Sequence, residues 1–283
     1  MSQNPAHRAP TRRPQPQARI PTLGRTCQLL RNERKLTFAK AYARHGISRS
    51  YLTEIEKDTR PPSLETLERM IDGYDADLLL ARHLRELRAP AEGLPSTDYL
   101  RQCVRENPAA IDHLRDLDGH GVLAAYLDPL WNMLACNDGF RTATPGLNES
   151  ELLIPAWLFS PPAKAFFLDW TSEATHSVAS HKTILGRYRD SEQARHFMQI
   201  LGPNPEFVRL WTASIRVAYG RNASDLLHLL DPTTGEPASY SLSISNVTQS
   251  EHVLLVTAIR KPYSGPPLRH PPSSSRHASA TRR

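Results

Sequence analysis

The residues best suited to chemistry lie between positions 48 and 60, where polar side chains recur at helical spacing. Leu52 and Ile55, three positions apart, mark the buried face of a helix predicted over residues 49–57. The opposite, polar face carries Arg49, Ser50, Thr53 and Glu54. Arginine can bond to guanine O6 and N7, serine can donate or accept, and glutamate can accept from cytosine N4. This face is therefore predicted to read base edges in a DNA major groove; the competing interpretation is an ordinary solvated helix face.

A tight turn must position this helix. Gly46 lies where the chain reverses, and glycine adopts the left-handed conformation without a Cβ penalty, so the preceding helix is predicted to end near His45. Ser48 is a preferred N-cap for the next helix. Pro61 and Pro62 cannot continue that helix, and apolar residues at helical spacing predict two more. Residues 23–88 thus contain five predicted helices, of which the second and third form a helix-turn-helix.

The segment GISRSYLTEIEKDTRPPSLETLERM (46–70) resembles the lambda-repressor-like helix-turn-helix domain of the xenobiotic-response-element regulators. The resemblance implies an all-α, five-helix domain that binds a double-stranded DNA operator, with the first residues of its third helix at the bases. The candidate DNA-binding residues in and beside this helix are Ser48, Arg49, Ser50, Tyr51, Thr53, Glu54, Lys57 and Arg60. The family usually has a glutamine that contacts phosphate at the start of the second helix, where this chain has Phe38.

Length and charge indicate a second domain and an anionic partner. The 283 residues, 39% of them hydrophobic, exceed what a helix-turn-helix domain needs, and the net charge of +6 suits a polyanion. Cys27, Cys103 and Cys136 are widely separated and form no CxxC pair, so neither a zinc site nor another cofactor is expected. No apolar run approaches the roughly 20 residues that span a bilayer. We expect a cytoplasmic protein, associated with a bacterial nucleoid, that has no membrane partner.

Both ends of the chain are predicted to be disordered, because they are rich in proline and polar residues. Residues 1–19 would form a basic N-terminal arm and residues 261–283 a basic tail. The arginines of the arm are expected either to stay solvated or to contact the DNA backbone or minor groove: Arg8, Arg12, Arg13 and Arg19. Between these ends we predict a helix-turn-helix domain over residues 20–90, a linker over 91–98 and a second domain over 99–260.

The second domain mixes strand and helix patterns. Asp128 and Pro129 separate two short apolar segments, which predicts a hairpin. Tyr240, Leu242 and Ile244 alternate with serines, as in a half-buried strand. The predicted strands are residues 121–127, 131–136, 225–230, 237–247 and 252–260, and the predicted helices are 162–181, 191–200 and 205–213. Two early strands, a helical middle and three closing strands predict an α+β domain with an antiparallel sheet.

Three ordered motifs in this region resemble the C-terminal domain of the MmyB-like transcription regulators, which has a PAS-like fold. They are WNMLACNDGF (131–140), LFSPPAKAFFLDWTSEA (158–174) and NPEFVRLW (204–211), followed by Pro232 and Gly235 before a strand. Two positions depart from the family: the apolar ELLIPAW (151–157) replaces an asparagine and an arginine ahead of Phe159, and Asp231 with Pro232 replaces a His-Pro pair. If those polar groups orient a ligand in relatives, this chain binds a different ligand or none.

The resemblance implies a cavity that senses a small apolar or amphipathic molecule, such as a fatty-acid-like ligand. An antiparallel sheet covered by helices can enclose a pocket that is mostly apolar and has a few polar groups. The candidate ligand-binding residues are Tyr126, Trp131, Leu134, Phe166, Phe167, Trp170 and Trp211. The alternative is that these side chains only form the core.

Catalysis is the competing class of function, but the sequence contains no HExxH, GxSxG or glycine-rich phosphate loop. His176 and His181 are five apart, which does not place them on one helix face, and the titratable cluster in IDHLRDLDGH (111–120) is interpreted as a solvated connector. We therefore expect no catalytic residues. The predicted function is a ligand-responsive transcription regulator that binds its operator as a homodimer. The alternatives are a second domain that only dimerises and, less favoured, an enzyme with a DNA-binding head.

Overall fold

The computed structural model describes residues 17–265, apart from residues 151, 223, 233 and 248–249 and the side chains of residues 149 and 150. Most of the predicted N-terminal arm and C-terminal tail, including three of the four arm arginines, lies outside the described residues. Ala18, which the sequence assigns to the arm, packs with Ile20 against the helical core of the second domain. The packed part of the chain therefore extends into the predicted arm.

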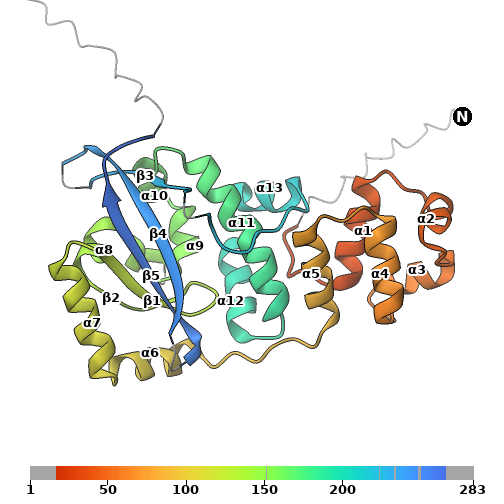
Figure 1. Cartoon of the computed structure of the whole chain (residues 1–283), viewed down its shortest axis with the longest axis horizontal. Helices are drawn as coiled ribbons and strands as arrows, with labels where there is room; N and C mark the ends of the chain where they lie inside the picture. The colour runs from red at the N-terminus through yellow and green to blue at the C-terminus, as the bar shows by residue number, and fades with distance from the viewer. Residues whose placement is uncertain (1–16, 151, 223, 233, 248–249, 266–283) are drawn as a thin grey trace, which may run out of the picture.

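Five short helices form the N-terminal region (Figure 1), which confirms the predicted all-α fold. Each helix begins after a residue whose side chain accepts a hydrogen bond from a backbone N–H of the first turn: Thr22, Thr37, Ser48, Ser63 and Asp77. Gly46 ends the second helix in the left-handed conformation, with a φ of 69°. The helices are α1 (Leu23–Glu33), α2 (Phe38–His45), α3 (Arg49–Glu56), α4 (Leu64–Gly73) and α5 (Leu78–Arg88).

These helices enclose one apolar core, in which Leu52 and Ile55 of α3 are buried as the sequence predicts. A buried ion pair crosses the core. Arg31 of α1 donates from Nε and Nη2 to the carboxylate of Glu56 on α3, and from Nη1 to the Leu36 carbonyl. Because α1 is tied to α3 by this pair as well as by apolar contacts, the orientation of α3 is fixed by the core.

The second region is built on one antiparallel sheet of five strands in the order β2-β1-β5-β4-β3. In the centre of the sheet, Ala125 of β1 lies opposite Val256 of β5. The first two strands form the predicted hairpin and the last three close the sheet, which confirms the α+β fold class. The strands are β1 (Leu123–Leu127), β2 (Met133–Cys136), β3 (Leu227–Leu230), β4 (Pro237–Val247) and β5 (Ser250–Lys261).

The helices of the second region correct the sequence-based prediction at two points. The single helix predicted over residues 162–181 is broken, because Phe167 and Leu168 bond to β3 through an isolated bridge to Leu229 and a 2.9 Å hydrogen bond to the His228 carbonyl. The segment interpreted as a connector is a helix, α7. The helices are α6 (Thr97–Arg105), α7 (Pro108–Gly119), α8 (Asp138–Ala143), the 3-10 turn η1 (Leu147–Ser150), α9 (Ile154–Leu158), α10 (Pro161–Phe166), α11 (Trp170–Arg187), α12 (Glu192–Leu201) and α13 (Pro205–Ala213).

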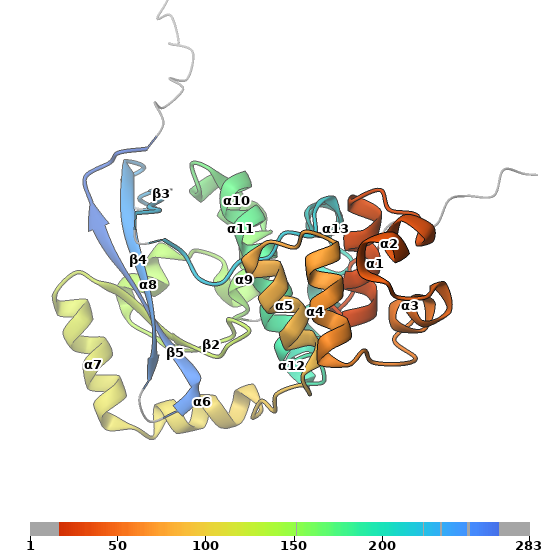
Figure 2. The ribbon, with the colours of Figure 1, turned by 45° about the vertical axis from the view of Figure 1, so that its right-hand side comes forward.

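The sheet separates two layers of different composition (Figure 1). Helices α6 and α7 cover one face, where Leu100, Val104 and Leu114 pack against β1, β2 and β5. The shorter helices α8, α9 and α10 cover the other face, where Trp157 and Phe166 join the apolar residues of the sheet. Helices α11, α12 and α13 lie between this layer and the five N-terminal helices (Figure 2).

The two regions meet where α11 packs against α5. Gly186 of α11 permits this approach, because a Cβ at that position would lie 2.8 Å from His83 Cε1 and 2.9 Å from Leu87 Cδ2. Such distances are shorter than a van der Waals contact. A side chain at position 186 would therefore have to displace the His83 and Leu87 side chains.

The predicted linker also contacts the second region. The backbone N–H of Glu92 donates to the Arg187 carbonyl of α11 (2.9 Å), and Gln193 of α12 donates to the Pro95 carbonyl. The linker is therefore held along α11 and α12.

Candidate functional site

The polar face of α3 points away from the core of the helix-turn-helix. Ser48 caps the helix by accepting from the Tyr51 N–H (3.3 Å), and Thr53 Oγ1 donates to the Arg49 carbonyl (2.7 Å). The exposed candidates are Ser48, Arg49, Ser50, Lys57 and Arg60, and the half-buried ones are Tyr51, Thr53 and Glu54. All eight predicted DNA-binding residues therefore reach the surface at one helix and the turn that follows it. Their individual roles at DNA stay a prediction.

Aromatic rings restrict two of these arginines. The Arg49 guanidinium lies over the Phe38 ring, 5.3 Å from its centroid, and Arg60 lies 4.6 Å from the centroid of Tyr51. Arg60 also approaches Glu54 to 3.4 Å. Stacking of this kind limits the orientations that a long side chain samples. Phe38 thus supplies a surface against which Arg49 rests.

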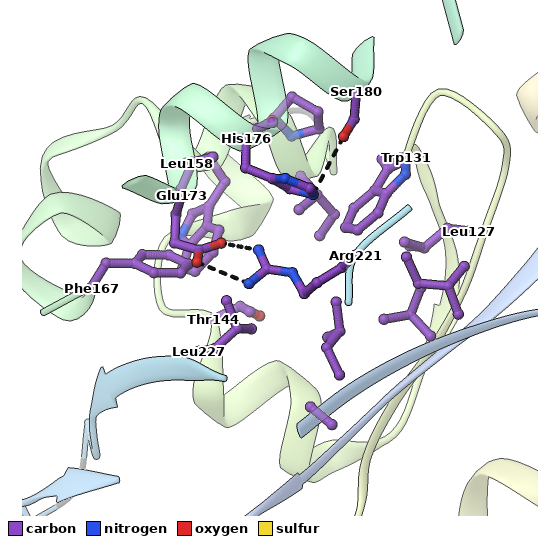
Figure 3. A pocket seen from close by; sticks show the side chains of 18 of the residues that line it. Leu127, Trp131, Thr144, Leu158, Phe167, Glu173, His176, Ser180, Arg221 and Leu227 are labelled. Atoms are coloured by element: carbon purple, nitrogen blue, oxygen red, sulfur yellow. Dashed lines mark hydrogen bonds and ion pairs between the residues drawn. The ribbon is translucent and has the colours of Figure 1, made fainter. Parts of the chain in front are cut away.

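A cavity of about 400 Å³ lies between the sheet and the helices α8 to α11 (Figure 3). Its wall is mostly apolar and comes from the strands as well as from the helices. Leu123 and Leu127 of β1 and Val256 and Ala258 of β5 form its floor on the sheet. Cavities of this size and composition are typical of sites for small organic ligands.

Three of the seven predicted ligand-binding residues line this cavity: Trp131, Phe166 and Phe167. Trp131 adopts a positive φ of 66°, directly after the β1 strand and its turn. Phe167 lies in the break between α10 and α11. In Figure 3, the Phe167 and Trp131 side chains lie on opposite sides of the same space.

The other four candidates do not line the cavity. Tyr126 and Leu134 lie on the opposite face of the sheet, packed under α6 and α7, because neighbouring residues in a strand point to opposite faces. Trp170 and Trp211 belong to the core between α11, α12 and α13, where Trp170 contacts the Phe159 ring. For these four residues the structure supports the alternative interpretation, that they form the core.

One corner of the cavity is polar. Arg221, from the segment between α13 and β3, reaches toward α11 and donates from Nη1 and Nη2 to the two carboxylate oxygens of Glu173 (Figure 3). Arg221 Nε is buried and has no hydrogen-bond partner in the described structure. His176 and Ser180 stand beside the pair, with Ser180 Oγ 3.4 Å from His176 Nε2. The polar groups of the cavity are thus concentrated on α11 and Arg221.

The two histidines of α11 are held neutral near pH 7. Burial lowers the pKa of His181 to about 4, and its ring stacks on Phe197. Burial and, to a lesser extent, the positive charge of Arg221 lower the pKa of His176. Both histidines line the cavity although they are five positions apart, because the cavity follows α11 from Glu173 to Ile184.

Sequence reasoning missed Arg221 and Glu173. Glu173 is part of the LFSPPAKAFFLDWTSEA motif, but the motif does not show which way its side chain points. Arg221 lies in a segment without strand or helix periodicity, so no local signal marks it. Only the fold brings the two residues together.

The titratable cluster of residues 111–120 lies on α7, away from this cavity. Its Asp118 accepts from the Gly139 N–H (2.8 Å), which fixes the start of α8. Among the described residues, no group of three or more His, Cys, Asp or Glu side chains is arranged to hold a metal ion. Within the same residues, no helix is long and apolar enough to cross a membrane.

Comparison with known proteins agrees with this architecture. The family model of the MmyB-like transcription regulator ligand binding domain matches residues 107–260, more than half of the chain. The chain belongs to this family. A helix-turn-helix domain model matches residues 22–84 of the same MmyB-like protein. The immunity repressor protein of Bacillus phage phi105 is 47% identical over 47 residues, 17% of this chain and 33% of that repressor. The MmyB-like chain therefore spans about a third of the length of this relative.

The two family matches assign the halves of the molecule. The N-terminal match is a helix-turn-helix domain, and the longer C-terminal match is an MmyB-like ligand-binding domain. The cavity of this MmyB-like protein lies within the region that matches the ligand binding domain.

Proposed function

We propose that this MmyB-like regulator binds a pseudo-palindromic operator as a homodimer and that a ligand in its cavity changes that binding. Two α3 helices would enter successive major grooves about 34 Å apart. The accessible polar face of α3 supports this placement. The residues assigned to DNA are Ser48, Arg49, Ser50, Tyr51, Thr53, Glu54, Lys57 and Arg60.

Exposed leucines support the dimer. Leu78 is 88% exposed and Leu79 is also exposed, both at the start of α5. These two leucines are neighbours and form a contiguous exposed apolar patch, which a second copy of the chain would cover. Sedimentation of the intact chain with and without operator DNA tests the assignment; a monomer on a single half-site would contradict it.

The observation that carries the ligand proposal is the apolar cavity with a single polar corner. Trp131, Phe166 and Phe167 would contact the apolar part of a small amphipathic molecule, such as one with a fatty-acid-like chain. Glu173 and Arg221 would face its polar end. A ligand can shift the equilibrium between two arrangements of the DNA-binding domains only if it binds one arrangement more tightly than the other.

Selection of genomic fragments by the purified protein tests the DNA-binding assignment. We expect an inverted repeat to be enriched, and Arg49→Ala to weaken binding to it by about 1–3 kcal/mol while relaxing discrimination at one base pair. Arg105→Ala is the matched control, because Arg105 is exposed on α6 in the other domain. Equal weakening of Arg49→Ala on random DNA would refute the base-reading role.

Native mass spectrometry of the purified protein tests the ligand assignment separately. We expect a co-purified small molecule whose occupancy falls when Phe167→Trp fills the cavity. An empty cavity that also accepts no added amphipathic compound would favour the alternative, in which the second domain only dimerises.

A further inference from the structure

The segment between α13 and β3, like α11, touches both the cavity and the DNA-binding domain. We call residues 214–222 the strap. Val217 of the strap is buried in the core of the helix-turn-helix domain. Tyr219 donates its hydroxyl to Glu86 of α5 and carries the Arg82 guanidinium 3.9 Å above its ring. Two residues later, Arg221 enters the ligand cavity.

The strap is also bound to α11, the helix that forms the polar wall of the cavity. The Ala218 N–H donates to the Ala179 carbonyl (3.1 Å), and Thr183 Oγ1 donates to the Ala218 carbonyl (3.2 Å). Lys182 donates to the Ser214 carbonyl. Any movement of Arg221 therefore acts on a short, anchored piece of chain, one end of which is inserted in the other domain.

Arg221 has a hydrogen-bonding requirement that the protein does not meet. Its side chain is only 10% exposed, both Nη atoms are used by Glu173, and the buried Nε has no partner in the described structure. A buried donor without an acceptor is unfavourable. A ligand that places an acceptor oxygen at Nε would remove this cost, whereas a hydrocarbon would not.

The charges around Arg221 indicate which kind of acceptor fits. Glu173 already neutralises the guanidinium, and His176 beside the pair is neutral near pH 7 because burial lowers its pKa. A carboxylate would bring an unpaired negative charge into an apolar cavity beside Glu173, which is strongly unfavourable. The carbonyl of an ester, amide, lactone or ketone accepts the same hydrogen bond without adding charge.

We propose that Arg221 Nε binds the neutral carbonyl group of an amphipathic ligand and that the strap transmits this contact to the helix-turn-helix domain through Val217 and Tyr219. The inference rests on the proposed function, because it needs a ligand in this cavity. By holding Arg221 in place, the ligand stabilises the docked arrangement of the two domains. Ligand binding then strengthens the docking of the two domains, and docking strengthens ligand binding by the same factor.

Calorimetry and hydrogen–deuterium exchange on the full chain test the inference with three probes of equal chain length: methyl octanoate, octanoate and octane. We expect the ester to bind at least about fivefold more tightly than octanoate or octane, and to slow exchange across the strap and α5 by a similar factor. The Ala218 amide, which bonds to α11, is the most direct reporter.

Variants of the chain separate ligand binding in the cavity from the transmission of its effect to α5. Arg221→Met/Glu173→Met removes both charges together, so no buried carboxylate is left unpaired, and we expect it to bind octane and the ester equally. Arg216→Met is the matched control, because Arg216 is exposed on the same strap. Tyr219→Phe removes only the hydroxyl that donates to Glu86; we expect it to retain ester binding and to lose most of the slowing at α5.

The outcomes distinguish the inference from the proposed function. If none of the three probes binds, both the amphipathic ligand and the inference fail. If the ester binds and exchange in the strap and α5 does not change, the cavity is a ligand site and only the transmission through the strap is refuted. Tighter binding of octanoate than of its ester would refute the neutral carbonyl.

Discussion

Among the residues that the structure describes, each domain of this regulator contains one buried arginine–glutamate pair, and the two pairs differ in how many of their polar atoms are hydrogen-bonded. In the helix-turn-helix domain, Arg31 uses Nε and both Nη atoms, at 2.5 to 2.9 Å from Glu56 and the Leu36 carbonyl, and its guanidinium lies 4.4 Å from the Phe38 ring centroid. In the ligand-binding domain, Arg221 is paired with Glu173 but retains a free Nε.

The difference reflects the surroundings of each pair. Arg31 and Glu56 are 10% and 4% exposed in a closed core, where every polar atom must find a protein partner. Arg221 and Glu173, at 10% and 16%, border a cavity that a ligand or water can enter. The same chemical pair therefore fixes α1 to α3 in one domain and leaves one buried donor without a described partner in the other.

Removal of the arginine from each pair is expected to give the largest difference between the two domains in the free energy of unfolding that is lost. Arg31→Met leaves Glu56 buried and unpaired, which should lower the free energy of unfolding of the helix-turn-helix domain by about 3–5 kcal/mol. Arg221→Met should cost the ligand-binding domain less, because Glu173 borders the cavity and can be hydrated. Urea unfolding followed by circular dichroism measures both. Equal losses would mean that the cavity gives Glu173 no access to water.

Truncation of a leucine in each domain compares a closed apolar core with the lining of a cavity. Leu52→Ala opens a void in a closed core and should lower the free energy of unfolding by about 2–5 kcal/mol. Leu242→Ala enlarges a cavity that already exists and should cost about 1 kcal/mol. The same urea experiment compares them. A larger loss for Leu242→Ala would show that the cavity is collapsed in solution.

Buried histidines should give an effect on stability that is spread over a pH range. Burial lowers the folded-state pKa of His83 at the domain interface and of His181 at the cavity to about 4, from an ordinary value of 6.5. Between these values the unfolded chain binds more protons, so stability falls as the pH decreases from 6.5 to 4, by up to about 1.4 kcal/mol per pH unit for each histidine.

Unfolding free energies at several pH values measure this slope. His83→Leu should make it shallower, whereas His113→Leu, at an exposed position on α7, should leave it unchanged. An unchanged slope in His83→Leu would show that the domain interface opens before the histidine takes up its proton.

The elements were largely predictable because their signals are local. Gly46 and Ser48 determine where α2 ends and α3 begins within three residues of chain, and the alternation around Tyr240 marks β4. The single helix predicted over residues 162–181 was wrong for the opposite reason. Phe167 and Leu168 leave the helical path to bond with β3, some 60 positions later, and nothing in their neighbourhood indicates it.

The surface positions of the eight residues around α3 followed more directly from the sequence than the lining of the cavity did. A helix face follows from spacing along one helix, so the eight residues around α3 share one surface. The residues that line a cavity depend on which face of the sheet each side chain occupies. Tyr126 and Leu127 are neighbours in β1, yet only Leu127 lines the cavity, because successive residues of a strand point to opposite faces.

The sequence by itself determined the two-domain order, the five capped helices and the strands of the antiparallel sheet, because caps, turns and periodicity act over a few residues. Tertiary structure alone decided where the cavity lies and what is polar in it. Arg221 and Glu173 are 48 positions apart, and Val217 inserts into a domain whose helices end more than a hundred positions earlier. Such contacts depend on how completed elements pack, and no local pattern along the chain records that packing.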